Sequence, residues 1–216
     1  MNDALRETRK YLLEVGFQIM ASEPDGNLVC DKAKFAIDKY IETFNERFSK
    51  GEGLIFTGGY GVGKTCAMAY FTAQLLNLPH NTLLKGYMDA PEIRRRVRYF
   101  NAYDMFATFA DFSNPEVRRI EINKMLSATI LLIDDFGTEF CTKGTLSEFN
   151  HLIDSRHGDR LPTFFTTNLK EETLGSAPEL KRAFERINAT NSWITIIGKN
   201  QRAEKKAKAD YWITQK

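Results

Sequence analysis

Residues 54–65 read LIFTGGYGVGKT, an apolar run followed by a glycine-rich loop, a lysine and a threonine. The spacing of Gly58, Gly63, Lys64 and Thr65 matches the phosphate-loop pattern. Glycines let a backbone turn tightly and point its N–H groups inward, and a helix behind the loop offers its positive end to an anion. The stretch therefore predicts a buried strand, a phosphate-binding loop and a helix, in that order.

The residue types of this loop suit a nucleotide. Lys64 can reach the β and γ phosphate oxygens, and the Thr65 hydroxyl can coordinate Mg²⁺. The alternative is a purely structural glycine turn, but the four fixed positions arise by chance in on the order of one per cent of chains this long. The predicted nucleotide-binding residues of the loop are Gly58, Gly59, Tyr60, Gly61, Val62, Gly63, Lys64, Thr65 and Cys66.

A second apolar run, ILLIDD at residues 130–135, ends in two carboxylates. A nucleotide site needs one carboxylate near Mg²⁺ and another that positions the attacking water. A strand parallel to the first would bring both acids to the edge that carries the loop. We predict Asp134 as the metal-side acid and Asp135 as the catalytic base. Alone the pattern is weak, because strands often end in acidic residues at a turn.

Two other positions are candidates for contact with the γ-phosphate. Asn168 closes the apolar run PTFFTTN, where it could orient the water, although an ordinary strand-end turn is the alternative. Arg186 lies one helical turn after Arg182. It could place its cation in the site of a neighbouring subunit, or it could form a surface salt bridge.

Short apolar strands alternate with amphipathic helices along the chain, which predicts a parallel sheet covered on both faces. Asp31 is a plausible helix cap, and residues 79–93 are expected to be loop. Strands are expected at residues 54–57, 95–102, 129–137, 162–168 and 193–198, and helices at residues 4–21, 31–48, 64–76, 102–112, 116–126, 145–156 and 178–187.

Length and composition fit a single domain, or one domain with a small appendage. The chain has 216 residues, and Lys+Arg 30 against Asp+Glu 28 gives a net charge of +2, so global charge says little about partners. Three widely spaced cysteines lack metal-binding spacing. No apolar run approaches the roughly 18 residues of a membrane span. We therefore expect a soluble cytoplasmic protein.

The motifs GGYGVGKT, VRYFNAYDM, ILLIDDFG, TTN, KRAFERI and WITIIGKNQR follow an order that resembles the DnaC/IstB-type AAA+ ATPases. This family includes helicase loaders and ATPase helpers of transposases. The resemblance implies an α/β fold, a P-loop NTPase of three α/β/α layers with parallel sheet order 5-1-4-3-2 and a reduced C-terminal lid. We expect an AAA+ ATPase domain at residues 49–216, preceded by a short helical N-terminal segment at residues 1–48. The short segment departs from the family, whose helicase loaders usually carry a larger N-terminal domain.

The resemblance implies ATP and Mg²⁺ as cofactors, hydrolysis to ADP and phosphate, and self-association that places one subunit's arginine in the next subunit's site. Asp135 stands where many AAA+ enzymes have glutamate. The functional positions of the family fall on residues of this chain as follows: Lys64 and Thr65 are the Walker A pair, Asp134 is the Walker B metal acid, Asp135 is the catalytic acid, Asn168 is sensor 1, Arg186 is the arginine finger and Arg202 is of sensor-2 type.

Three functions remain open at this point. The first is a DNA replication factor, a helicase loader that binds ATP and Mg²⁺, oligomerises and helps place a DnaB-type replicative helicase on single-stranded DNA. The second is an IstB-type helper of a transposase on duplex DNA, and the third is a nucleotide-gated adaptor with little hydrolysis.

A basic cluster at residues 94–98 lies beside the aromatic residues Tyr99 and Phe100. Cations that follow a nucleic-acid backbone and aromatic rings on which bases stack are typical of single-stranded DNA binding. The alternative is a solvated run of charge on the protein surface, with the aromatic residues partly in a core strand.

Overall fold

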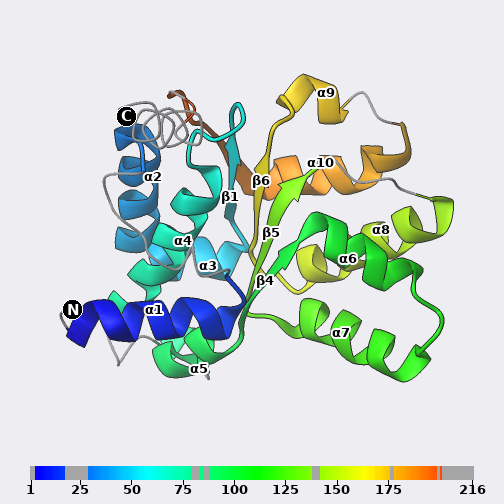
Figure 1. Ribbon diagram of the computed structural model, residues 1–216, viewed down its shortest axis with the longest axis horizontal. Helices are drawn as coiled ribbons and strands as arrows, with labels where there is room; N and C mark the ends of the chain where they lie inside the picture. Colours follow the sequence, from blue (N-terminus) through cyan, green and yellow to red (C-terminus); the bar gives the residue numbers. More distant parts are fainter. Residues whose placement is uncertain are drawn as a thin grey trace, which may run out of the picture.

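The computed structural model describes residues 3–17, 29–78, 83–84, 88–137, 142–175, 178–198 and 200. Figure 1 shows a twisted central sheet between two groups of helices. Its parallel strands lie in the order β4-β5-β6-β1-β7. Numbered along the chain without the short β2 and β3, this order is 2-3-4-1-5, which is the predicted AAA+ order counted from the other edge. The strands are β1 (Gly53–Thr57), β4 (Val97–Asn101), β5 (Ile130–Phe136), β6 (Thr163–Thr167) and β7 (Asn191–Thr195).

Burial explains why the central strands read as nearly continuous apolar runs. Every residue of β1 and β6 is buried, whereas most residues of the edge strands β4 and β7 are half-buried. Successive side chains of a strand point to opposite faces. Leu54 and Phe56 accordingly enter one core, and Ile55 enters the other. Both faces therefore need a covering layer of helices.

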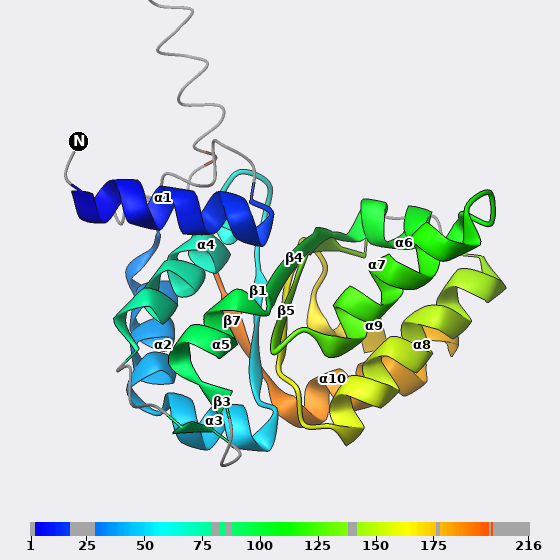
Figure 2. The same ribbon diagram turned by 90° about the horizontal axis from the view of Figure 1, so that it is seen from below.

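Helices on the first face come mainly from the N-terminal part of the chain, as Figure 2 shows. They are α1 (Asp3–Val15), α2 (Asp31–Glu42), α3 (Phe44–Lys50), α4 (Lys64–Gln74) and α5 (Ala90–Arg95). The opposite side of the molecule in Figure 2 carries α6 (Ala102–Ala110), α7 (Pro115–Ser127), α8 (Lys143–Gly158), α9 (Glu171–Gly175) and α10 (Lys181–Thr190). Short 3₁₀ turns, Leu75–Asn77 and Pro178–Leu180, adjoin α4 and α10.

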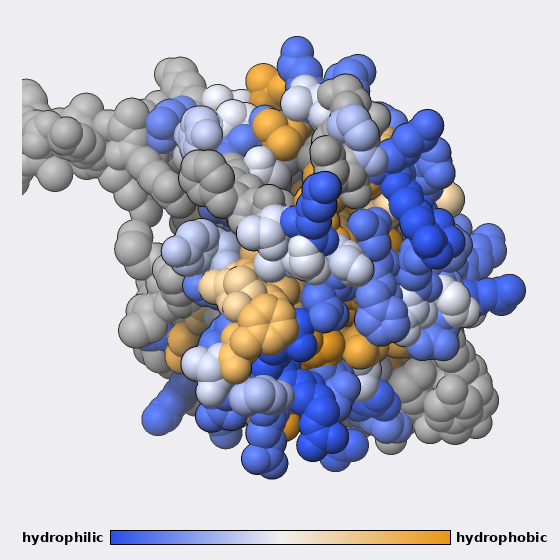
Figure 3. Space-filling view, turned by 90° about the vertical axis from the view of Figure 1, so that its right-hand side faces the viewer, coloured by the Kyte–Doolittle hydropathy of each residue, from blue (hydrophilic) through white to orange (hydrophobic). Residues whose placement is uncertain are grey.

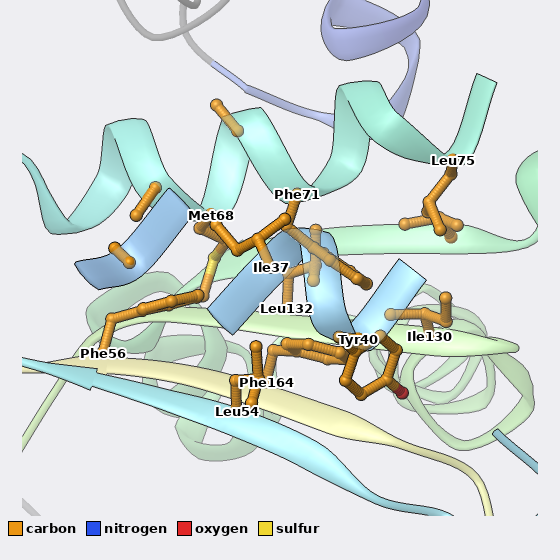
Figure 4. Close-up of a cluster of buried hydrophobic side chains, with 14 of the residues drawn as sticks. Ile37, Tyr40, Leu54, Phe56, Met68, Phe71, Leu75, Ile130, Leu132 and Phe164 are labelled. Atoms are coloured by element: carbon orange, nitrogen blue, oxygen red, sulfur yellow. The ribbon is translucent and has the colours of Figure 1, made fainter. Parts of the chain in front are cut away.

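An aromatic cluster joins the N-terminal helices to the sheet (Figure 4). The rings of Tyr40 in α2, Phe71 in α4 and Phe164 in β6 have centroids 4.2 to 5.4 Å apart. The Tyr40 hydroxyl donates to the Glu52 carbonyl at 2.6 Å. Residues of α1, α2 and α3 thus share a core with β1 and β6. The division of the chain at residue 48 stays a prediction.

The helices on the second face present a mainly hydrophilic surface with a small apolar area (Figure 3). Exposed apolar side chains of α7 and the loop before it are Phe112, Val117 and Ile120. The Arg118 guanidinium lies 4.8 Å from the centre of the Phe112 ring and pairs with Glu148 at 2.7 Å. Within the described residues, no helix is long and apolar enough to cross a membrane.

Some predicted boundaries were wrong. Residues 31–48 form two helices rather than one, because Thr43 leaves the helical backbone with φ −108° and ψ 25°. The N-cap of α2 is Cys30 rather than Asp31. Asp31 lies in the first turn, where the positive end of the helix dipole stabilises its negative charge. The first helix ends at Val15, since Gly16 adopts a left-handed φ of 119°.

Residues 79–93 were predicted to be loop, and this prediction was wrong. They include the start of α5 and an antiparallel pair, β2 (Leu83–Leu84) and β3 (Met88–Asp89). Strands of two residues are too short to leave an alternating pattern in the sequence. The reduced C-terminal lid and Arg202 lie outside the described residues.

Candidate nucleotide-binding site

The phosphate loop follows the carboxyl end of β1 and runs into the N-terminus of α4. Two of its glycines are required by the backbone. A Cβ at Gly58 would collide with the Ile196 carbonyl oxygen, and Gly61 has a left-handed φ of 71°, which residues with a Cβ rarely adopt. The loop can therefore hold this shape only with glycine at these positions, and the shape leaves backbone N–H groups available for an anion.

Lys64 is buried at 6% exposure beneath this loop. Its ammonium group donates to the carbonyl oxygens of Gly58 at 3.1 Å and Gly59 at 2.8 Å. It also donates to Asn168 Oδ1 at 2.6 Å. The structure therefore brings Asn168, at the end of β6, directly to the lysine of the loop, as expected if both act on one phosphate group.

Asp134 is buried at 3% exposure near the end of β5. Among the described residues, three hydroxyl groups donate to its carboxylate. Thr65 Oγ1 lies 3.1 and 3.0 Å from the two carboxylate oxygens, the Tyr99 hydroxyl lies 2.8 Å from Oδ2, and Thr166 Oγ1 donates to Oδ1. These hydroxyls come from α4, β4 and β6, so three separate elements fix one acid.

The residues of the site fit a magnesium–nucleotide complex. Mg²⁺ prefers hard oxygen ligands and is usually held by one or two carboxylates together with substrate phosphates. The Thr65 hydroxyl and the Asp134 carboxylate supply such oxygens beside the loop. In the described part of the chain, no group of three or more His, Cys, Asp or Glu residues forms a separate metal site.

A β-bulge separates the environments of the two acids. The register between β5 and β6 shifts between Ile133 and Phe136, and Asp135 has a left-handed φ of 56°. Its backbone N–H donates to Thr166 Oγ1 at 2.8 Å, which offsets part of the interrupted strand pairing. Bulges next to active sites re-aim side chains. Asp134 is consequently buried while Asp135 is half-buried.

Sequence reasoning missed two residues of this site. Thr166 lies within the TTN motif, but nothing in the motif singled it out from its neighbours. Tyr99 was considered as a possible DNA platform or as part of a core strand, but not as a partner of Asp134, because that bond depends on the pairing of β4 with β5. A hydroxyl placed across two paired strands leaves no signal in the spacing of residues along the chain.

Arg186 is held away from the phosphate loop of its own chain. It lines a crevice of about 130 Å³ together with Gly51, Thr163 and Asn191. These three residues lie at the amino ends of β1, β6 and β7, whereas the loop follows the carboxyl end of β1. The crevice and the loop are therefore at opposite ends of the strands.

An aspartate of α8 holds both arginines of the late helix. Asp154 Oδ1 lies 2.6 Å from Arg186 Nε, and Asp154 Oδ2 lies 2.6 Å from a terminal nitrogen of Arg182. The salt bridge considered from the sequence is therefore present. The Arg186 side chain remains 32% exposed to solvent in this salt bridge.

The basic cluster at residues 94–98 is engaged mainly with backbone. Arg94 donates weakly to the carbonyls of the turn after α4, Arg96 donates to Ser127 at 2.8 Å, and Arg98 donates to Val97 at 2.7 Å. The Tyr99 ring packs into the first core. These contacts favour a structural role for most of the cluster over a stacking surface for bases.

Comparisons with known proteins agree with this architecture. No protein-family model matches the chain. It is 24% identical over 189 residues to the replicative helicase loader DnaI of Bacillus subtilis (strain 168), a match that covers 81% of this chain and 56% of that protein. The chain therefore spans a little over half the length of this curated relative.

Solved structures establish the fold. The crystal structure of the DnaC helicase loader is similar with a TM-score of 0.57 and 21% identity, over 77% of this chain and 89% of that one. The replication initiator DnaA bound to AMPPCP and single-stranded DNA is similar with a TM-score of 0.57 and 15% identity, over 80% and 49% of the two chains. The chain thus has the three-layer AAA+ P-loop fold, and the predicted resemblance to DnaC-like helicase loaders is confirmed.

Proposed function

We propose that this protein binds and hydrolyses ATP with Mg²⁺ and uses this cycle to load a replicative helicase onto single-stranded DNA. One observation carries the proposal. Lys64 with Asn168, and Thr65 with Asp134, meet at the carboxyl ends of β1, β5 and β6. This arrangement is the one that phosphoryl transfer requires, because its catalysis rests on positioning and on stabilising charge.

Each residue has a distinct role in this proposal. The ammonium of Lys64 leaves the loop carbonyls and binds β and γ phosphate oxygens, while Asn168 orients the water. Thr65 and Asp134 hold the metal ion, which when bound neutralises charge on the phosphates. Asp135, set apart by the bulge, accepts the proton of the attacking water. The remaining loop residues and Arg202 complete the contacts to the nucleotide.

The γ-phosphate needs a further cation, and we assign it to Arg186 of a neighbouring subunit. The opposite placement of crevice and loop supports this assignment, because one chain cannot bring its own Arg186 to its own loop. The protein must then self-associate to complete its site. Asp154 pairs with this arginine at 2.6 Å until a phosphate competes for it.

Mixed subunits test this assignment. Arg186→Ala and Lys64→Ala proteins should each hydrolyse ATP at least about a hundredfold more slowly than wild type. Their mixture should recover activity, since Lys64→Ala subunits still supply Arg186 to Arg186→Ala subunits. Arg182→Ala, which changes the other partner of Asp154, serves as the matched control. A mixture with no recovered activity would contradict a trans-acting arginine.

The helicase partner is proposed from the relatives. The B. subtilis protein is a replicative helicase loader, and the DnaA structure holds single-stranded DNA. Sizing chromatography with candidate DnaB-type helicases, ATP and single-stranded DNA should yield a complex that Lys64→Ala weakens. If no helicase associates, the loader function is wrong. Preference for duplex DNA would favour the transposase helper, and an undiminished complex with Lys64→Ala would favour an adaptor.

A further inference from the structure

Tyr99 lies on β4, the edge strand next to β5, and its hydroxyl reaches the buried carboxylate of Asp134. The distance from the phenol oxygen to Asp134 Oδ2 is 2.8 Å. Tyr99 pairs with Leu132 across the two strands, so its side chain must extend along β5 toward the carboxyl edge to make this contact. A phenylalanine would fill the same space without making the bond.

The phenol is the donor in this bond, because an ionised carboxylate can only accept. The hydrogen bond therefore runs from a neutral O–H to a carboxylate, the class of bond that is shorter and stronger than one between neutral groups.

The end of α1 supports the ring that carries this hydroxyl. The rings of Phe17 and Tyr99 have centroids 4.4 Å apart, and Phe17 is 2% exposed. Gly16 allows the chain to pass close by, because a Cβ there would lie 3.2 Å from the Tyr99 carbonyl oxygen. The residues that follow α1 therefore pack against Tyr99, whose hydroxyl bonds Asp134.

If the site binds Mg²⁺, the three hydroxyls that donate to Asp134 cannot all continue to do so. Thr65 is required by the metal itself, which leaves Tyr99 and Thr166 to fix the carboxylate. Thr166 holds Oδ1 from β6, and Tyr99 holds Oδ2 from the opposite neighbour, β4. Without the phenol, the carboxylate loses its support on one side and can rotate away from the metal position.

We propose that Tyr99 is a positioning residue of the magnesium site, braced by Phe17 at the end of α1. This inference rests on the proposed binding of ATP with Mg²⁺. It adds a link from the end of the N-terminal helix through two rings in contact to the metal acid. Residues that hydrogen-bond to a metal ligand typically change metal affinity roughly 10–100-fold.

Binding of a fluorescent ATP analogue, titrated with Mg²⁺, tests the proposal without measuring turnover. Tyr99→Phe should raise the Mg²⁺ concentration at half-maximal effect roughly tenfold. Its affinity for the analogue in EDTA should stay close to wild type, and the loss of one charge-assisted bond should lower its thermal stability slightly. Tyr103→Phe is the matched control, since Tyr103 is 69% exposed and its loss of one hydroxyl should change none of these values.

Two results would overturn the inference. In the first, wild type binds the analogue in a Mg²⁺-dependent manner and Tyr99→Phe has the same Mg²⁺ midpoint. This result would contradict the role of Tyr99 and leave the proposed function standing. Wild-type protein that binds no nucleotide removes both.

Phe17→Leu tests the brace separately. It keeps the phenol but removes the ring that packs against it, so the Mg²⁺ midpoint should rise by a smaller factor than in Tyr99→Phe. A wild-type midpoint in this variant would sink the link to α1.

Discussion

Two cations are buried in the described part of the chain, and they are held in different ways. Arg156, at 1% exposure, donates from its guanidinium to the carbonyl oxygens of Met125 at 2.9 Å, Ala128 at 2.7 Å and Pro162 at 2.8 Å, and to Thr163 Oγ1 at 2.9 Å. Lys64, at 6%, donates to two loop carbonyls and one amide side chain.

The acceptors account for the difference between these two cations. Those of Arg156 belong to the end of α7 and the start of β6, which secondary structure fixes in place. Burial lowers the pKa of Arg156 to about 9, which still leaves the guanidinium charged at neutral pH, and its planar fork of donors is satisfied by these acceptors. The acceptors of Lys64 belong mostly to a glycine loop, and phosphate oxygens can replace them. Arg156 therefore stabilises the fold, whereas Lys64 can exchange its loop acceptors for phosphate oxygens.

The largest effect expected from this comparison follows Arg156→Met. The change leaves several carbonyl oxygens buried without donors, and the free energy of unfolding should fall by about 3 kcal/mol or more. Urea unfolding followed by circular dichroism measures it. The free energy of unfolding of Arg156→Lys should lie between those of wild type and Arg156→Met, because one ammonium group cannot reach acceptors on both α7 and β6.

Arg119→Met serves as the control for this prediction, since Arg119 is exposed on α7. If Arg156→Met and Arg119→Met unfold at the same urea concentration, the bonds to α7 and β6 do not stabilise the fold, and the comparison fails.

Lys64→Met should have the opposite profile. Removing a buried cation whose partners are replaceable should change the free energy of unfolding by no more than about 1 kcal/mol. Nucleotide affinity should fall about 10–100-fold, because charge-assisted bonds to phosphate are lost. Calorimetric titration with ATP and Mg²⁺ gives the affinity, with the exposed Lys124→Met as control. A large loss of stability in Lys64→Met would make Lys64 as structural as Arg156.

The smallest effect is expected for Thr166→Val, because the Thr166 hydroxyl contributes both to the fold and to the site. It bonds Asp134 and accepts the backbone N–H of Asp135, so its loss should lower stability by about 1 kcal/mol. The Mg²⁺ midpoint for nucleotide binding should rise a few-fold. Thermal unfolding and the Mg²⁺ titration measure the two effects, and Thr195→Val, at an exposed position, should show neither. An effect on stability alone would place Thr166 with Arg156.

The sheet and the meeting of the site residues could be predicted for a physical reason. Carboxyl ends of parallel strands share one edge, so residues that follow three apolar runs must lie together. Tyr99 and Arg156 could not be predicted, because their partners come from elements distant in sequence. Cross-strand register and the position of a helix end decide such contacts. The break at Thr43 also escaped prediction, since apolar spacing continues through it.

The strand order has a consequence for how the protein is made. In the sheet, β1 lies between β6 and β7, and both of these strands come late in the sequence, from residue 163 onward. The ribosome therefore delivers the phosphate loop long before the strands that will hold it. A nascent chain that stops short of residue 163 carries the complete loop sequence, but it lacks both neighbours of β1 and the asparagine that meets Lys64. Such a chain bears the signature of a nucleotide-binding protein and has no site.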